Sequence, residues 1–231
     1  MPNSPPAAGP LLLGAVCRGR NPLTGIQAAA EILNAQLAPD DSRRRYADRI
    51  IRDSQRLEHL LHSFAMVLKP PVEPARLHRL APLLESAVRA VERDVCRAPA
   101  QVNLDLPADL PPIPLHPEQI CWAVAELVRN ALAAADEERE GLVEVSVRCL
   151  PGEGNLVIEV VDNGRGIDAA QLRRLAREPV EGESCLGLRI VNWVVAGHGG
   201  TLRLRGRSGI GSMATIELPM SAPAPESAPG V

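Results

Sequence analysis

The sequence predicts an α+β protein, in which an N-terminal two-helix hairpin is followed by an α/β sandwich. Three observations lead to this prediction. Two long segments with helical apolar spacing come first, a proline-rich connector follows them, and short strand patterns then alternate with helices. Hydrophobic residues make up 45% of the 231 residues and aromatic residues only 2%, so Leu, Val, Ile and Ala must fill the cores.

The hairpin is predicted at residues 11–68. Apolar residues of its first helix follow a seven-residue repeat, namely Val16, Leu23, Ile26, Ala30, Leu33 and Leu37. After a break at residues 38–42, the second helix continues the spacing with Tyr46, Ile50, Leu57, Leu61, Phe64 and Leu68. Two helices with one apolar seam each cannot cover their own faces, so we expect a homodimer whose hairpins form a four-helix bundle. The alternative is a hairpin that packs on the rest of its own chain.

Residues 69–74 are a stiff connector, because proline fixes φ and lacks the amide hydrogen. They separate the hairpin from a second domain at residues 75–219. The two ends, residues 1–10 and 220–231, are rich in Pro, Ala, Ser and Gly and have no periodicity, so we expect disordered tails there.

The second domain is predicted to contain helices and strands in mixed order. Helical spacing occurs at residues 82–96, 117–132, 169–177 and 186–196. Strand patterns occur at residues 102–106, 142–150, 156–161, 201–205 and 213–218, and residues 107–114 have the composition of a loop. Strands collected on one side and helices on the other indicate a sandwich.

Two groups of residues in this domain have the chemistry of a nucleotide site. Glu126 and Asn130 are four apart and share a helix face, where a carboxylate can orient water and a carboxamide oxygen can bind Mg²⁺. Asp162 follows a strand pattern and can accept a hydrogen bond from an adenine amino group, while Gly164 and Gly166 let the backbone approach a nucleotide. Taken alone, Asp162 to Gly166 is equally typical of a turn.

Two later segments extend this set. Leu186-Gly187-Leu188 comes before a predicted helix, whose N-terminus favours phosphate. Ser212, which follows Gly209-Ile210-Gly211, offers a hydroxyl to the adenine edge. The order of all four segments favours a nucleotide site over a set of unrelated turns.

In this order the motifs resemble the ATP-binding domain of the GHKL family, which histidine kinases share with gyrase, the large heat-shock chaperone and mismatch-repair ATPases. Glu126 and Asn130 match its N box, and Asp162, Gly164 and Gly166 match its first glycine box. The resemblance implies that ATP or ADP binds here, with Mg²⁺ on Asn130.

The resemblance extends to the other segments. Leu186-Gly187-Leu188 matches the end of the second glycine box, and Ser212 matches a position that helps to hold adenine. Residues 11–68 are similar to the dimerisation and phosphotransfer hairpin of sensor histidine kinases, with residues 20–26 matching the second half of its H box. The resemblance therefore implies a dimer that works with a response regulator or another signalling protein.

The main departure from the family is at the phospho-accepting histidine, whose place Cys17 takes, with Arg18 in place of the carboxylate. Arg18 and Arg20 can lower the pKa of a thiol, but they cannot act as a general base. We favour an inert Cys17 over a reactive thiol, whether phosphorylated or redox-sensing. On the register of the seam, Cys17 and Asn21 should face solvent or a partner.

The second glycine box is also eroded. Where the family has Gly-x-Gly-Leu-Gly-Leu, residues 183–188 are Glu-Ser-Cys-Leu-Gly-Leu, so two glycines are missing and a carboxylate stands close to the triphosphate. No phenylalanine lies between Gly166 and Leu186, so the F box is absent. We therefore expect weaker ATP binding than in active relatives.

Three functions follow from these observations. The first is a protein that binds ATP or ADP and docks on a response regulator or partner kinase, without autophosphorylation at the usual position. The second is a phosphatase, because the family uses the position of Asn21 to aim water at a phospho-aspartate. The third is an active kinase that uses Cys17 or a partner residue as phospho-acceptor. We predict the first function, with the second nested inside it.

Charge and composition argue against other classes. The net charge of −3 and the scattered basic residues disfavour a nucleic-acid binder. The apolar run at residues 11–16 is too short for a membrane span, so we expect a cytoplasmic protein. Five cysteines without C-x-x-C spacing argue against a disulfide framework and a zinc site. Sixteen residues precede Cys17, so we expect the input signal to come through a partner, the cysteines or the nucleotide itself.

Overall fold

The computed structural model describes residues 8–68, 75–94, 100–135, 141–150, 154–168 and 183–221. The chain divides into two compact units, Met1–Val72 and Glu73–Val231, and each unit is described by itself. Their boundary falls within the segment 69–74 that the sequence predicts as a connector. The conformation of this connector lies outside the described residues.

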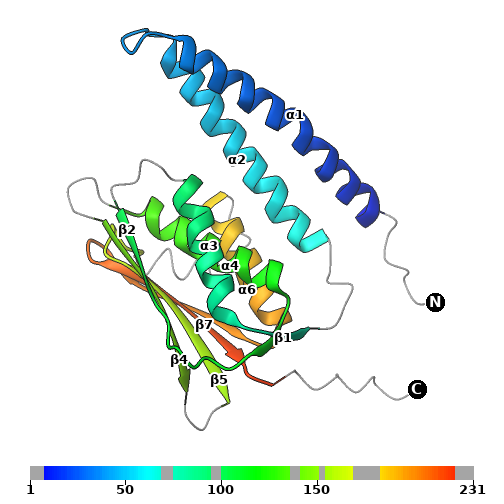
Figure 1. Ribbon diagram of the computed structural model, residues 1–231, viewed down its shortest axis with the longest axis vertical. Coiled ribbons are helices and arrows are strands. Elements are labelled where there is room, and N and C mark those ends of the chain that lie inside the picture. The colour runs from blue at the N-terminus through cyan, green and yellow to red at the C-terminus, as the bar shows by residue number, and fades with distance from the viewer. Residues whose placement is uncertain are drawn as a thin grey trace. The chain divides into compact units, whose positions relative to one another are not determined.

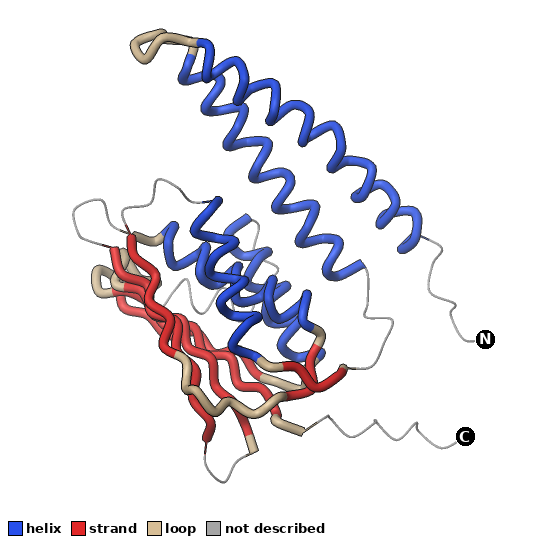
Figure 2. Tube along the Cα trace, viewed as in Figure 1, coloured by secondary structure: helices blue, strands red, loops and turns tan. Residues whose placement is uncertain are grey.

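The first unit is a helical hairpin, as predicted (Figure 2). Its helices are α1, Ala8–Gln36, and α2, Arg44–Leu68. α1 includes Ala8–Pro10, which the sequence analysis assigned to the tail; proline is tolerated in the first turn of a helix because the amides there have no intrahelical acceptor.

Asp41 organises the turn between the two helices. Its Oδ1 accepts a hydrogen bond from the Arg43 backbone N–H at 2.8 Å, and its Oδ2 lies 2.6 Å from Arg43 Nη2. The Arg43 side chain, helped by this backbone bond, lowers the pKa of the Asp41 carboxyl to about 2. Farther into the hairpin, Asn34 Nδ2 donates to Asp48 at 2.9 Å, and Asn34 Oδ1 accepts from Arg44 Nε at 3.2 Å. These side chains fix how α1 and α2 align.

Only part of the predicted apolar seam is covered by the partner helix. Leu23 and Ala30 of α1 and Ala47 of α2 are buried. Six other residues of the predicted seams are 42–56% exposed, namely Ile26, Leu33, Tyr46, Ile50, Leu57 and Phe64. The isolated hairpin therefore presents an apolar surface along most of its length.

The second unit is a sandwich of a five-stranded sheet and a helical layer, which confirms the predicted fold class (Figure 1). The strands lie in the order β2-β4-β5-β7-β6, with β2 and β4 parallel and all other neighbours antiparallel. Their bounds are β2 Ala100–Asp105, β4 Gly141–Leu150, β5 Asn155–Asp162, β6 Thr201–Arg207 and β7 Gly211–Pro219. The helices α3 Leu80–Asp94, α4 Pro117–Ala133 and α6 Glu183–Gly197 cover one face of this sheet.

The core of this unit lies between the sheet and these helices. Val147, Ile158 and Ile216 are paired across β4, β5 and β7, and at most 4% of each is exposed. α4 presents Ile120 and Val124, one turn apart and fully buried. Aliphatic side chains thus fill the core, as the low aromatic content predicts.

Two short strands were not predicted. β1, Arg76–His78, pairs antiparallel with β3, Ile113–Leu115. β3 overlaps residues 107–114, for which the sequence predicts a loop. Ile113 and Leu115 are both buried, but three residues around a proline are too few for strand alternation to stand out.

Three boundaries differ in ways that matter for the site. α6 begins at Glu183, so Leu186-Gly187-Leu188 lies inside the helix and not before it. Ser212 belongs to β7, and Asp162 is the last residue of β5. The helix predicted at residues 169–177 lies outside the described residues. None of the described helices has the length and apolar character to cross a lipid bilayer.

Candidate functional site

Asp162 and Ser212, fifty residues apart in the chain, meet at the end of the β5–β7 ladder, where they are register partners. Asp162 Oδ1 accepts a hydrogen bond from the Ser212 backbone N–H at 3.3 Å, and the Ser212 hydroxyl donates to Asp162 Oδ2. Only 8% of Asp162 is exposed. The two residues that were predicted to hold adenine are therefore adjacent and share a hydrogen bond.

Asp162 also shapes the loop that follows β5. Its Oδ1 accepts from the Gly164 backbone N–H at 3.0 Å. A carboxylate has about four acceptor positions, and the hydrogen bonds from Gly164 and Ser212 occupy three of them. One acceptor position on Oδ2 remains for a donor from outside these residues.

Gly164 brings this loop onto the end of α4. A Cβ at residue 164 would lie 2.1 Å from the Ala134 carbonyl oxygen, which also accepts from the Arg165 backbone N–H at 2.9 Å. Only glycine leaves room for this approach. The loop is thereby fixed one turn away from Asn130, the predicted Mg²⁺ ligand.

Gly166 and Gly211 bring the same loop close to the β6–β7 turn. Gly166 has φ +71° and a Cβ there would lie 2.1 Å from the Arg207 carbonyl oxygen. Gly211 has φ +137° and a Cβ there would lie 1.9 Å from the Asp162 carbonyl oxygen. Both conformations favour glycine. The sequence analysis assigned these glycines to contact with a nucleotide, and the structure shows that they also allow close contact within the protein.

Glu126 of α4 contacts the start of α6. It is 5% exposed, and its Oε2 lies 3.3 Å from Arg129 Nη1. Its Oε1 occupies the space where a side chain at residue 187 would be, since a Cβ on Gly187 would lie 1.9 Å from it. The glycine that was predicted to leave room for phosphate therefore leaves room for a carboxylate of its own chain. Leu186 and Leu188, on either side, are half-buried.

Asn130 lies one turn beyond Glu126 on α4. Its Nδ2 is buried and has no hydrogen-bond partner among the residues that the structure describes. A buried amide without a partner costs about 1–3 kcal/mol, so this side chain is suited to a ligand. A half-turn of the carboxamide puts its oxygen in the same place.

The other predicted residues belong to the hairpin, which is described by itself. Asn21 and Thr24 are exposed on α1 while Leu23 is buried, as the seam predicts. Arg20 Nη2 lies 3.6 Å from Glu58 Oε1 and joins α1 to α2. Cys17 lies within α1, but its side chain is outside the described residues, so its predicted exposure stays a prediction.

Two contacts around the candidate site were not predicted from the sequence. Arg129 pairs with Glu126 three residues earlier, which i,i+3 spacing on a helix could have indicated. The carbonyl of Ala134 anchors the loop after β5, and no feature of the sequence marks a backbone acceptor of this kind.

Comparison with known families agrees with this geometry. Residues 116–222 match the histidine kinase-, DNA gyrase B- and HSP90-like ATPase family, and residues 20–67 match the His Kinase A (phospho-acceptor) domain. The chain has the two domains of a histidine kinase core. In this histidine kinase core, the part that matches the His Kinase A domain starts at residue 20 and so does not include Cys17.

Known relatives align with most of the histidine kinase core. The sensor histidine kinase ZraS of Escherichia coli is 26% identical over 219 residues, which cover 93% of this chain and 46% of ZraS. The sensory histidine kinase/phosphatase NtrB of Salmonella typhimurium is 32% identical over 209 residues, covering 85% of this chain and 58% of NtrB. The chain thus spans about half the length of these curated relatives.

A solved structure supports the fold. Full-length ShkA, crystallised in complex with AMPPNP, aligns with a TM-score of 0.67 at 20% sequence identity, over 93% of this chain and 46% of ShkA. At this identity the match shows that the histidine kinase core has the same fold.

The contact between Gly187 and Glu126 predicts which glycine of α6 cannot be replaced. In Gly187→Ala the new methyl group overlaps Glu126 Oε1, so we expect the free energy of unfolding to fall by about 1–3 kcal/mol. Gly197→Ala in the same helix is the control, because its Cβ would have no atom within 4 Å; we expect a change near zero. Urea denaturation measures both. If the two variants are equally stable, or if Glu126→Ala does not partly restore Gly187→Ala, the contact is unimportant.

Proposed function

We propose that this chain binds ATP or ADP with Mg²⁺ in its second unit, and that it acts in two-component signalling by docking on a response regulator or partner kinase. It does so without phosphorylating itself at the usual position. The observation that carries the nucleotide part is the arrangement around Asp162, whose buried carboxylate keeps one acceptor position next to Ser212.

The adenine base fits this acceptor position. Its exocyclic amino group is a donor, and Asp162 Oδ2 can accept from it while Oδ1 holds Gly164. The Ser212 hydroxyl, beside this oxygen, is placed to face the same edge of the base. ShkA, which has the same fold in the aligned region, was crystallised in complex with AMPPNP, and this supports the proposal.

Asn130 is the proposed ligand of Mg²⁺. Its buried amide has no partner among the described residues, and a carboxamide oxygen suits a hard cation. Mg²⁺ would neutralise part of the phosphate charge when a nucleotide is bound. Glu126, held by Arg129 and packed on Gly187, keeps α4 and α6 in place around the phosphates. The changes at residues 183–185 in the second glycine box favour weak binding.

Calorimetric titration with ATP and Mg²⁺ tests the nucleotide part. We expect a binding signal for the intact chain and a loss of about tenfold or more in affinity for Asn130→Ala, because the variant lacks the metal ligand. Asn192→Ala is the control, since Asn192 is exposed on α6, and we expect unchanged affinity. A chain that gives no heat of binding is a scaffold without a nucleotide.

The hairpin supports the dimer and docking part of the proposal. Its exposed apolar residues on α1 and α2 would be covered by the hairpin of a second copy, and the match to the His Kinase A domain supports the same arrangement. Sedimentation equilibrium should give about twice the chain mass of 24.7 kDa; the mass of one chain contradicts the dimer.

A phosphatase activity is nested in this proposal. Asn21 is exposed on α1, where it can reach a docked partner, and the NtrB relative is a kinase/phosphatase by name. The alternative is an active kinase with Cys17 or a partner residue as acceptor. A cysteine thiol at this position has no imidazole or carboxylate beside it in sequence to take its proton, so we favour the phosphatase.

An assay with radiolabelled ATP separates these functions. We expect no label on the chain, and a loss of label from a phosphorylated receiver domain that slows in Asn21→Ala. Thr24→Ala, also exposed on α1, is the control and should have a smaller effect. Strong self-labelling that disappears in Cys17→Ala would establish the kinase instead.

A further inference from the structure

Three histidines cluster at the end of the second unit where the chain enters it. His78 is the last residue of β1, His116 precedes α4 and His198 follows α6. The His116 backbone N–H donates to His198 Nε2 at 3.0 Å, and the two rings meet edge to face with centroids 5.3 Å apart. His198 Nδ1 lies 2.8 Å from the Val194 carbonyl oxygen.

These hydrogen bonds define the protonation state of His198. A carbonyl oxygen can only accept, so Nδ1 carries the proton, and Nε2 must be the unprotonated acceptor of the His116 N–H. A second proton on Nε2 would make this nitrogen a donor that faces the His116 N–H, itself a donor, and would put a charge on a ring that is only 5% exposed. The contact between His116 and His198 therefore requires a neutral imidazole.

The surroundings also oppose protonation. Burial is the main cause that lowers the pKa of His198 below its usual value of 6.5, and the charge of His116 adds to it although the Val194 carbonyl acts in the opposite direction. Burial and the charge of His78 lower the pKa of His116 in the same way. A charge on His78 thus disfavours a proton on His116, and a charge on His116 disfavours a proton on His198.

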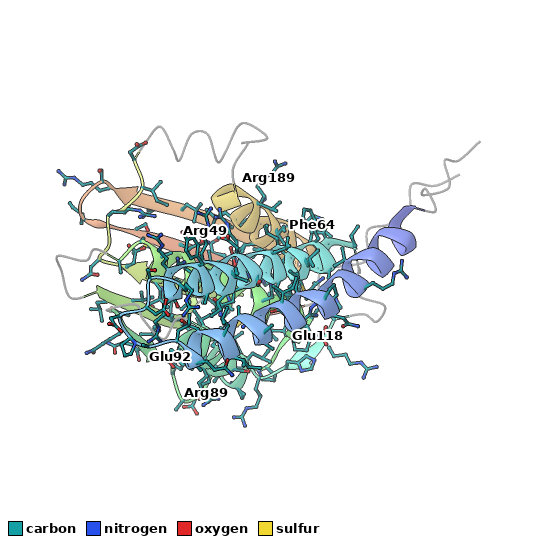
Figure 3. The ribbon with its side chains drawn as sticks, turned by 90° about the horizontal axis from the view of Figure 1, so that it is seen from above. Arg49, Phe64, Arg89, Glu92, Glu118 and Arg189 are labelled. Atoms are coloured by element: carbon teal, nitrogen blue, oxygen red, sulfur yellow. The ribbon has the colours of Figure 1, made fainter. Side chains whose placement is uncertain are left out.

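The charged residues of neighbouring elements are turned toward solvent. Glu118, in the first turn of α4, is exposed (Figure 3), as are Arg76 and Arg79 on either side of β1 residues Leu77 and His78. On the sheet, Arg203 of β6 pairs with Glu217 of β7 at 3.7 Å. Glu217 alternates with the buried Ile216 and Leu218 of β7, and Arg203 alternates with the half-buried Leu202 and Leu204 of β6, so both lie on the face away from the helices.

The position of the cluster links it to the connector. β1 is the first described strand after residues 69–74, and His78 pairs with Ile113 of β3. β3 ends at Leu115, so the next residue is His116, which is bound to His198. The β1–β3 pair and the α4–α6 contact are therefore joined through one residue.

We propose that His78, His116 and His198 form a proton-sensitive clasp, in which acidification breaks the hydrogen bond between His116 and His198 and loosens the β1–β3 pair. Loosening β1 releases Arg76–His78 from their pairing with β3 at the start of the second unit. Because nucleotide and phosphate are not involved, this regulation is independent of the proposed function.

The direction of the pH effect follows from the lowered pKa. Between pH 6.5 and the lower pKa of His198 in the folded chain, the unfolded chain binds more protons. The stabilisation by the clasp is therefore complete above pH 6.5 and is lost as the pH falls through the folded-state value.

NMR titration of the 231-residue chain from pH 7.5 to about 5 tests this proposal. Long-range ¹H–¹⁵N spectra should show His198 with its proton on Nδ1 at neutral pH and a midpoint below that of a free histidine. The amide signals of β1 and β3 should shift with the same midpoint. In His198→Gln, whose amide oxygen can accept from His116 without titrating, these strand shifts should disappear. His59→Gln on α2 is the control and should leave them unchanged.

Two results would overturn the clasp. One is a His198 that titrates like a free imidazole, and the other is a His198 with a lowered midpoint while the amides of β1 and β3 stay unchanged. The titration of the unmodified chain gives this answer even if His198→Gln is unstable.

Discussion

The candidate site of the second unit depends on the hydrogen bonds that the buried carboxylate of Asp162 accepts. It ends β5, accepts from Gly164 in the following loop and binds Ser212 across the sheet. Since these contacts use both oxygens, the carboxylate sets the conformation of the loop and the register of β7 at the same time. The loop is then carried onto the end of α4 through the Ala134 carbonyl. Sheet, loop and helix are thus fixed relative to one charged group.

A second carboxylate connects the two helices on either side of the site. Glu126 fills the space above Gly187, so α4 and α6 approach each other more closely than side chains would permit. Buried carboxylates are unfavourable without partners, and Arg129 supplies one for Glu126. The same polar groups that could act on a nucleotide therefore also hold the helices together, and a substitution among them changes the fold and the site together.

Much of this architecture could be predicted from the sequence, because long apolar repeats and glycine motifs carry strong local signals. All five strands of the sheet begin within two residues of their predicted positions, and the hairpin begins three residues before its predicted start. Asp162 and Ser212, which were predicted to share a role, are register partners. The contact between Gly187 and Glu126 could not be predicted, since it depends on how two helices far apart in sequence approach. β1 and β3 were missed because three-residue strands have too little pattern.

The hairpin and the second unit point to different parts of the function. On the hairpin, Cys17 stands at the position where the sequence analysis places the family's phospho-acceptor, and α1 is helical through it, so the proposed dimerisation and docking do not require a histidine there. In the second unit Asp162 and Ser212, which we propose to face adenine, are hydrogen-bonded to each other, whereas residues 183–185 lack two glycines of the family pattern.

The central claim is that Asp162 accepts a hydrogen bond from the adenine amino group. Calorimetry that compares ATP with inosine triphosphate, which has a carbonyl oxygen in place of that amino group, tests it most directly. A hydrogen bond to a charged acceptor contributes about 1.5–3 kcal/mol, so the account predicts that inosine triphosphate binds roughly ten- to a hundredfold more weakly. Equal affinities for the two nucleotides would contradict it.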